Sequence, residues 1–334
     1  MKKFLKKIFI FFLPLIIIFI VYIRTDPFKV IRNYKIYLSD YIMLDRGFVS
    51  AKVFLRNYKK FRYNSFIFGS SRSCAFTAKE WQKYLDEGSI PYSFGAWNET
   101  IEGIYRKIKL IDSINNPINN VLLIIDTDYT FKKKNSLKYE HYLVSGKSLF
   151  KFHFDYFVLY IRKLWLIPAS VDYELFHKKR KYMHHFIGMK PGDLDPVTND
   201  WLPKSEEYIL KDSIEYYRNA DKIFYKRPAT QQEAPPQIDI AARKILLKMK
   251  NIFDKHNTRI KIIISPLYDQ VRINHKDLDV LREVFGRNNI YDFSGINDIT
   301  NNVYNYNNDV KHYRKRTANK ILTMIYKKNN REKD

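Results

Sequence analysis

The sequence predicts an α/β fold: a doubly wound, mainly parallel five-stranded sheet with a helical and loop insertion and an N-terminal transmembrane helix. Three observations predict it. Short buried apolar runs alternate with amphipathic helical patterns over most of the 334 residues, and such alternation is typical of parallel strands joined by right-handed crossovers. The alternation is interrupted once by a long aromatic and basic stretch. An unbroken apolar run with lysines before it opens the chain.

Residues 1–24 are predicted to form a signal anchor. Four lysines in MKKFLKK stand before the apolar run Ile8–Ile23. This run spans roughly 24 Å as a helix, and the flanking Phe4 and Leu5 extend it toward the thickness of a bilayer. The lysines favour a cytoplasmic N-terminus, which places the rest of the chain outside the cytoplasm.

A cleaved signal peptide is the alternative for this segment. Residues 22–27 (YIRTDP) contain no small-x-small cleavage site, so an uncleaved anchor is favoured. Residues 25–60 are polar, aromatic and irregular in pattern, and we expect a membrane-proximal lead-in there. The folded domain is expected over residues 61–330.

The domain is predicted to begin with the buried strand Asn64–Gly69, an apolar run that ends at glycine. Thr77–Glu80 has the pattern of a capping box, and it opens a helix that Gly88 ends. The next predicted elements are a short strand over 91–95, a helix over 99–114 and the strand 121–126, which is the clearest fully buried strand.

Residues 131–235 are predicted to be an insertion with its own short helices, or a substrate-binding cap. They are aromatic, basic and contain the loops PGDLDP and ATQQEAPP. In a doubly wound sheet the site lies beyond the carboxyl ends of the strands, so residues that follow strands are the candidates for function. The alternation resumes with a helix over 237–256, a strand over 259–265, a helix over 278–285, a strand over 289–294 and a final helix over 314–326.

A serine-rich turn, Gly69-Ser70-Ser71-Arg72-Ser73, follows the first predicted strand. A serine on a tight strand-to-helix turn has an exposed hydroxyl, and its backbone N–H lies near the positive end of the helix. Both features suit a nucleophile whose reaction forms an oxyanion. An ordinary structural turn is the alternative, because Gly-Ser-Ser turns are common.

Asp309 and His312 stand just before the last predicted helix. Three residues of separation place two side chains on one side of a helical turn. The carboxylate can then hold the imidazole Nδ1–H and leave Nε2 to accept a serine proton. A surface or capping pair is the alternative when these two residues are considered alone.

Three short blocks together resemble the SGNH hydrolases. FIFGSSRS is similar to the first block of that family in a Gly-Ser-Ser form, YSFGAWNET to the second and DVKHY to the last. The resemblance implies a flavodoxin-like SGNH fold with Ser71 as nucleophile, His312 as base and Asp309 orienting it. It also implies an oxyanion hole built from the Ser71 N–H with Gly95 or Asn98.

Within this family, the chain resembles membrane-anchored SGNH-like proteins of polysaccharide O-acetylation, as for alginate, and of teichoic acid D-alanine transfer. This resemblance implies an extracytoplasmic O-acetyltransferase or acetylesterase that acts on a cell-surface polysaccharide. It further implies that the acyl donor is a membrane-bound O-acyltransferase. The alternative is a non-catalytic SGNH-like protein that binds glycans or assists assembly.

The third block departs from the family pattern. Asp126-Thr127-Asp128 stands where the family has Gly-x-Asn-Asp, and a carboxylate cannot donate to an oxyanion unless it is protonated. Three alternatives follow: the oxyanion hole is incomplete, Asn98 substitutes for the missing donor, or Asp126 and Asp128 orient Arg72.

The formal charge of +24, from 59 Lys and Arg against 35 Asp and Glu, indicates either the codon bias of an AT-rich genome or an anionic partner such as nucleic acid, a membrane surface or an acidic polysaccharide. Of these partners, an acidic cell-surface glycan is the one expected. No nucleic-acid-binding motif is present, so no nucleic acid is expected. Aromatic residues of the insertion are candidates for stacking on sugar rings: Tyr139, Tyr142, Phe150, Phe154, Tyr156 and Trp165.

Cys74 is the only cysteine, which excludes an intrachain disulfide and a cysteine-rich metal site. As a nucleophile it needs a base in the same turn, and a buried thiol is expected instead. The sequence has no Walker-type or dinucleotide-type glycine pattern. We therefore expect neither a cofactor nor a metal.

Overall fold

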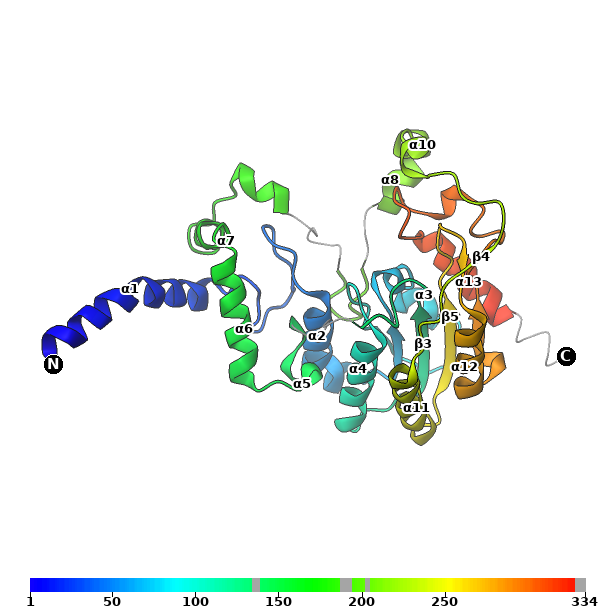
Figure 1. The fold of residues 1–334 in the computed structure, drawn as a ribbon, viewed down its shortest axis with the longest axis horizontal. Coiled ribbons are helices and arrows are strands. Elements are labelled where there is room, and N and C mark those ends of the chain that lie inside the picture. Colours follow the sequence, from blue (N-terminus) through cyan, green and yellow to red (C-terminus); the bar gives the residue numbers. More distant parts are fainter. Residues whose placement is uncertain (134–138, 187–193, 202–204, 328–334) are drawn as a thin grey trace.

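Five parallel strands form the central sheet of the computed structural model, which describes residues 1–133, 139–186, 194–201 and 205–327 (Figure 1). The predicted α/β class and the five-stranded parallel sheet are confirmed. The spatial order is β2-β1-β3-β5-β7, so the order reverses between β1 and β3, where a doubly wound sheet opens a crevice. The strands are β1 (Ser65–Phe68), β2 (Pro91–Ser93), β3 (Asn120–Ile125), β5 (Arg259–Ile264) and β7 (Ile290–Asp292).

Helices cover both faces of this sheet because side chains along the strands alternate between two apolar clusters. In β1, Phe66 and Phe68 belong to the cluster on one face and Ile67 to the cluster on the other. Strands buried on both faces read as continuous apolar runs, which is why the sequence revealed them. The first face carries α2 (Arg46–Phe61), α4 (Ile101–Ser113), α11 (Ile240–Lys255) and α12 (His275–Phe285), and the second carries α3 (Ala78–Gln82) and α13 (Lys315–Lys327).

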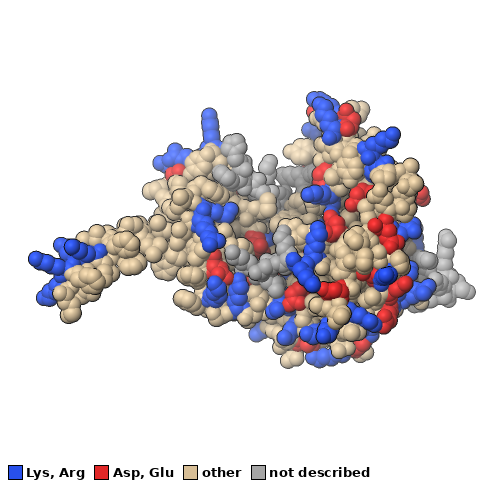
Figure 2. Space-filling model, in the orientation of Figure 1, with Lys and Arg blue, Asp and Glu red and all other residues tan. Residues whose placement is uncertain are grey.

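The predicted N-terminal helix is α1 (Lys2–Thr25), which projects from the body of the protein (Figure 1). It is long and apolar enough to cross a membrane, and its apolar stretch is not buried in the protein. Figure 2 shows basic side chains at its free end and uncharged residues along its length. The helix ends where Asp26 adopts a left-handed conformation and its carboxylate accepts the N–H groups of Val30 and Arg32, both at 2.9 Å.

The segment between α1 and β1 differs from the expected irregular lead-in, because its second half is helix α2. Asp45 caps this helix by accepting the Phe48 N–H at 2.9 Å. Phe48, Val49, Val53 and Phe54 are buried in the core, so α2 is a structural part of the domain. The spacing of these four residues was the sequence signal for an amphipathic helix. The helix after Thr77 is also shorter than predicted, since α3 ends at Gln82.

The insertion contains short helices, as expected, and they lie in two places. The helices α6 and α7 pack beside α1 and α5 packs against α4, whereas α8 and α10 lie on the side of the molecule that carries α13 (Figure 1). Their bounds are α5 (Tyr142–Ser145), α6 (Leu149–Arg162), α7 (Leu166–Ser170), α8 (Ser205–Lys211), α9 (Ser213–Tyr216) and α10 (Ala220–Ile223). A two-stranded parallel ladder joins β4 (Gln232–Glu233) to β6 (Val271–Arg272).

A buried charged triad ties the insertion to the helical layer. Lys107 of α4 contacts the Glu99 carboxylate and lies 3.1 Å from Glu140 Oε1. All three side chains are almost completely buried. Burial and the nearby Glu99 raise the pKa of Glu140 to about 8, although Lys107 opposes this shift. Burial favours a neutral lysine, but Glu140 and Glu99 raise the pKa of Lys107 above its usual range.

The raised pKa of Glu140 predicts that the protein loses stability as the pH rises. In the folded protein Glu140 keeps its proton up to about pH 8, whereas in the unfolded chain it releases the proton above its ordinary pKa of about 4.5. The retained proton stabilises the folded protein fully below about pH 4.5. This stabilisation is lost as the pH rises through about 8. The melting temperature at pH 9 should therefore lie several degrees below that at pH 6. Glu140→Gln should flatten this dependence, whereas Glu87→Gln, at an exposed position, should leave it unchanged. An equal slope in Glu140→Gln and the parent would contradict the prediction.

Candidate active site

The serine turn lies directly beyond the carboxyl end of β1. Ser70 caps the short 3₁₀-helix η1 (Ser71–Ala75), because its hydroxyl accepts the Arg72 N–H at 3.2 Å. Gly69 precedes it with φ +153°, and a Cβ there would lie 2.8 Å from Ser73 Cβ and 3.0 Å from Ile124. Only glycine therefore allows β1 to turn this sharply against β3.

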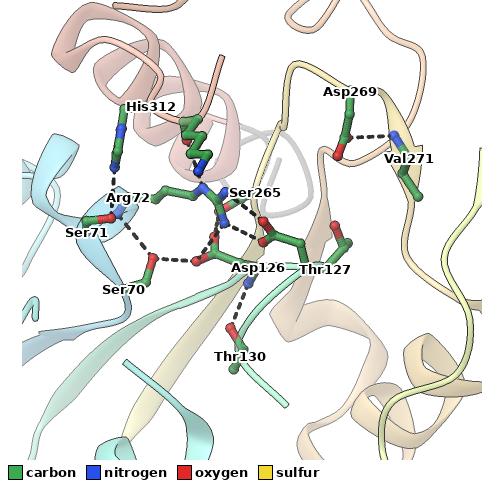
Figure 3. Close-up of polar contacts among 12 residues, drawn as sticks. Ser70, Ser71, Arg72, Asp126, Thr127, Thr130, Ser265, Asp269, Val271 and His312 are labelled. Atoms are coloured by element: carbon green, nitrogen blue, oxygen red, sulfur yellow. Dashed lines mark hydrogen bonds and ion pairs between the residues drawn. The ribbon is translucent and has the colours of Figure 1, made fainter. Parts of the chain in front are cut away.

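Ser71, His312 and Asp309 form a continuous hydrogen-bonded chain. Ser71 Oγ lies 2.9 Å from His312 Nε2 (Figure 3), and His312 Nδ1 lies 3.1 Å from Asp309 Oδ1. The serine and histidine are 241 positions apart in sequence. The contact is within the range expected between a nucleophile and its base.

The Asp309–His312 segment is a loop, and this corrects the expected helical turn. The loop is held by an antiparallel bridge between Tyr306 and Tyr313. Asp309 Oδ1 accepts the N–H groups of Lys311 at 2.6 Å and of His312 at 2.9 Å. Burial alone raises the pKa of the Asp309 carboxyl, but the hydrogen bond and charge of His312, with these two N–H donors, lower it below its ordinary value. Asp309 is therefore ionised at neutral pH.

Arg72 joins the serine turn to the histidine loop and to the residues after β3. Its Nε donates to the Lys311 carbonyl at 2.8 Å, and its two terminal nitrogens bind the Asp128 carboxylate at 2.5 and 3.0 Å. Asp126 lies 3.3 Å from the same guanidinium. Burial raises the pKa of Asp128, but the hydrogen bond and charge of Arg72 lower it below its ordinary value. A bidentate pair of this kind fixes the orientation of the Arg72 guanidinium and also neutralises its charge.

Asp126 is fully buried and holds the neighbouring strands together. One of its oxygens accepts the Ser70 hydroxyl, and the other accepts the Ser265 hydroxyl at 2.6 Å (Figure 3). Its own N–H donates to Thr130 Oγ1 at 2.8 Å. The buried carboxylate is thus supplied with donors from the ends of β1 and β5. It is an acceptor in every one of these side-chain contacts.

The two oxyanion candidates from the second block lie in different places. Gly95 packs against η1, since a Cβ on it would meet Ser73 Oγ at 2.7 Å and Cys74 Sγ at 3.0 Å. In the described part of the chain no group accepts a hydrogen bond from the Gly95 N–H. Asn98 is exposed, has φ 52° and lines a separate pocket of about 540 Å³.

A pocket of about 310 Å³ opens beside Ser71 and His312. Three of its lining residues, Trp201, Glu206 and Glu207, belong to the insertion. The pattern of the insertion gave no signal for these individual residues, because nothing in their spacing relates them to the serine turn. The other lining residues are Arg72, Cys74, Ala75, Asn307, Tyr313 and Lys315.

Glu206 is placed at this pocket by an ion pair with Arg314, at 2.6 and 3.1 Å. Trp201 packs edge-on against Trp97, with ring centroids 5.4 Å apart. Trp97 lines the larger pocket and Trp201 the smaller one, so this aromatic pair lies between the two. The insertion therefore contributes one wall of the pocket at Ser71.

Cys74 is buried in the serine turn, as expected. Burial raises the pKa of its thiol to about 11, so it is protonated at neutral pH and a poor nucleophile. Among the described residues no group of three potential ligands is placed to hold a metal ion. Ser71 is the nucleophile candidate with a base in hydrogen-bond range.

No known family model matches this sequence, and no curated protein matches it. The site itself has a defined chemistry. A hydroxyl in contact with an imidazole, which in turn contacts an ionised carboxylate, is arranged to lose its proton as it attacks an electrophilic carbon. The N–H groups of Ser71, at the start of η1, and of Gly95, which packs against η1, are the candidate donors for the oxygen that becomes negative.

Proposed function

We propose that this protein is an extracytoplasmic serine acyl-group enzyme of the SGNH type. It acts as an O-acetyltransferase or acetylesterase on a cell-surface polysaccharide. The observation that carries the proposal is the Ser71–His312–Asp309 chain, assembled from the ends of the first and last parts of the α/β domain. The strand order, which is the flavodoxin-like order 2-1-3-4-5, supports it.

The reaction begins when Ser71 Oγ attacks the carbonyl carbon of an acyl ester and His312 Nε2 accepts the serine proton. The tetrahedral oxyanion is stabilised by the N–H of Ser71, at the first residue of η1, and by that of Gly95. The carbon–oxygen bond of the ester then breaks, and His312 returns the proton to the leaving alkoxide. A sugar hydroxyl or water attacks the acyl-enzyme, His312 accepts its proton, and Ser71 is regenerated.

The altered third block has a positioning role in this proposal. Asp126 and Asp128 hold Arg72, and Arg72 binds the loop that carries His312. These contacts support the third of the alternatives, in which the two carboxylates orient Arg72. Asn98 lines the other pocket, so we assign it no part in the oxyanion hole.

The proposed partners are a glycan as acceptor and a membrane-bound O-acyltransferase as acyl donor. The pocket at Ser71 has the volume for an acyl group and part of a sugar. The net charge of +24 favours an acidic polymer. Glu206 and Glu207 line the pocket together with the basic residues Arg72 and Lys315, so acidic and basic side chains are both available to a glycan bound there.

The alternative function is a non-catalytic glycan-binding or assembly protein of the same type. One observation favours it: the third block supplies carboxylates in place of an amide donor, and Asn98 does not line the pocket at Ser71. An oxyanion hole of backbone N–H groups alone is weaker by about 2.7–4 kcal/mol for each missing donor.

Covalent labelling separates these two functions. A fluorophosphonate probe phosphonylates a serine that is activated by an adjacent base, so the parent protein should be labelled at Ser71. Ser71→Ala should abolish labelling. Ser73→Ala is the matched control, because that hydroxyl lies in the same turn and donates to the Ser70 carbonyl at 2.7 Å. An unlabelled parent, or equal labelling of Ser71→Ala, would favour the binding protein.

Arg72→Lys tests the positioning role of the guanidinium. Lysine keeps the charge but cannot bind Asp128 in a bidentate manner and reach the Lys311 carbonyl at once. We expect kcat for a small acetyl ester to fall by about 10- to 100-fold with little change in KM, because misplacement of the base affects mainly the chemical step. Arg287→Lys, at an exposed position, is the control. A rise in KM with unchanged kcat would assign Arg72 to substrate binding instead.

We also propose that α1 stays attached as an uncleaved anchor, with the domain outside the cytoplasm. The end of α1 is part of the folded structure: Tyr22 and Thr25 are buried, and Tyr22 packs against Tyr160 with ring centroids 5.3 Å apart. Cleavage near residue 24 removes Tyr22 and Phe19 and exposes the aromatic residues of α6 that they cover.

A further inference from the structure

Helix α6 has two apolar faces, and the domain core uses one of them. Phe152, Tyr156 and Tyr160 are at most 2% exposed and form the face toward the core. A second set, Phe150, Phe154, Phe157 and Ile161, follows the spacing i, i+4, i+7 and i+11. Residues at this spacing share one side of a helix. The second face is therefore a continuous apolar stripe along α6.

This second face contacts the membrane helix. Phe157 packs edge-on against Phe19 of α1, with centroids 5.1 Å apart, and against Tyr22 at 5.5 Å. Figure 1 shows α6 running across the base of α1, where α1 meets the domain. If α1 crosses a bilayer, α6 therefore lies at the membrane surface, with this stripe on the side from which α1 emerges.

The remainder of the stripe is uncovered in the described structure. Phe150 is 80% exposed and Phe154 is 47% exposed, and their rings stack with centroids 6.1 Å apart. Leu164, just beyond the end of α6, is 69% exposed. A contiguous exposed apolar patch of this kind marks an interaction surface. Its continuity with α1 indicates lipid as the occupant.

Basic side chains flank the stripe. Lys151 lies over the Phe154 ring at 5.4 Å, and Lys163 over the Trp165 ring at 5.8 Å. Arg32 donates to the carbonyl groups of Ile23 and Arg24 at the end of α1, at 2.8 and 3.0 Å. Aromatic residues at headgroup depth beside lysine and arginine are typical of helices that lie in the interface of anionic membranes.

We propose that α6 is an interfacial helix that lies on an anionic phospholipid surface through Phe150, Phe154 and Leu164. This inference rests on the proposal that α1 is retained as an anchor. It adds a second attachment beside α1, so the domain does not swing freely on a single helix. Phe150 and Phe154, considered in the sequence as sugar-stacking residues, are assigned to lipid. Tyr139, Tyr156 and Trp165 line the larger pocket.

The depth of α6 can be measured on the full chain in vesicles of phosphatidylcholine and phosphatidylglycerol. A nitroxide is attached at Phe150→Cys or Phe154→Cys, and its collisions with oxygen and with a water-soluble nickel chelate are compared. Leu247→Cys is the matched control: Leu247 is 44% exposed on α11, which lies away from α1 in Figure 1. Because Cys74 is buried, the parent chain serves as the unlabelled blank.

We expect positions 150 and 154 to be accessible to oxygen and protected from the chelate by at least several-fold relative to position 247. Chelate accessibility equal to that at 247 would overturn the inference. Protection from both reagents would also overturn it, since a protein or a second copy would then cover the stripe. A mature protein that begins near residue 24 would also overturn the inference, because the inference requires that α1 is retained as an anchor. Ser71→Ala should leave the depth unchanged, so these outcomes are independent of catalysis.

Discussion

Replacing Ser71 by alanine should reduce turnover of a small acetyl ester by about 10⁴- to 10⁶-fold, because the acyl-enzyme can no longer form. His312→Ala should have an effect of the same size. The two act as one unit, since Ser71 Oγ lies 2.9 Å from His312 Nε2, so the double variant should be no worse than either single one. Initial rates on an acetyl ester measure the activity of the two single variants and of the double variant.

Asp309→Asn should have a smaller effect, about 10²- to 10⁴-fold on kcat. Asparagine keeps the size of the side chain but loses the charge that stabilises the imidazolium, and it can favour the wrong tautomer. The exposed residues His177 and Asp298 provide matched controls as His177→Ala and Asp298→Asn. Full activity of Ser71→Ala in cells would reject the triad and leave the glycan-binding protein as the function.

Lys107→Met should lower the free energy of unfolding by about 3–5 kcal/mol, because it leaves two buried acidic side chains without the ammonium group that both of them contact. Lys107 is completely buried between Glu99 and Glu140. Lys248→Met, an exposed change on α11, should be close to neutral. Denaturant unfolding of the full chain in detergent measures both.

Removing all three ionisable groups tests whether the loss of stability in Lys107→Met arises from unpaired charge. The triple variant Glu99→Gln, Lys107→Met, Glu140→Gln should recover a large part of the stability lost in Lys107→Met, since no ionised group then remains unpaired in the interior. A triple variant as unstable as Lys107→Met would show that packing around the lysine, and not its charge, is what matters.

Much of the scaffold could be predicted because strands buried on both faces leave a local signal. The runs in β1 and β3 are continuous and apolar, β5 ends in three consecutive isoleucines after Lys261, and glycine or polar residues follow all three strands. Because functional sites lie beyond the carboxyl ends of such strands, the position of Ser71 after β1 predicts it as a candidate. Helix α2 was not predicted, because polar and aromatic residues stand between its apolar positions and give the segment an irregular pattern. Its buried residues Phe48, Val49, Val53 and Phe54 nevertheless have helical spacing.

The sequence by itself determined the α/β alternation, the apolar N-terminal helix and the residue types able to form a Ser-His-Asp site, since each depends on neighbours a few positions apart. Only the tertiary structure decided that Ser71 and His312 meet across 241 positions, and that Asp126 and Asp128 bind Arg72. It also separated Gly95, against the serine turn, from Asn98, in another pocket. These arrangements depend on strand order and on the path of the insertion, which are set by packing between distant segments and leave no local pattern.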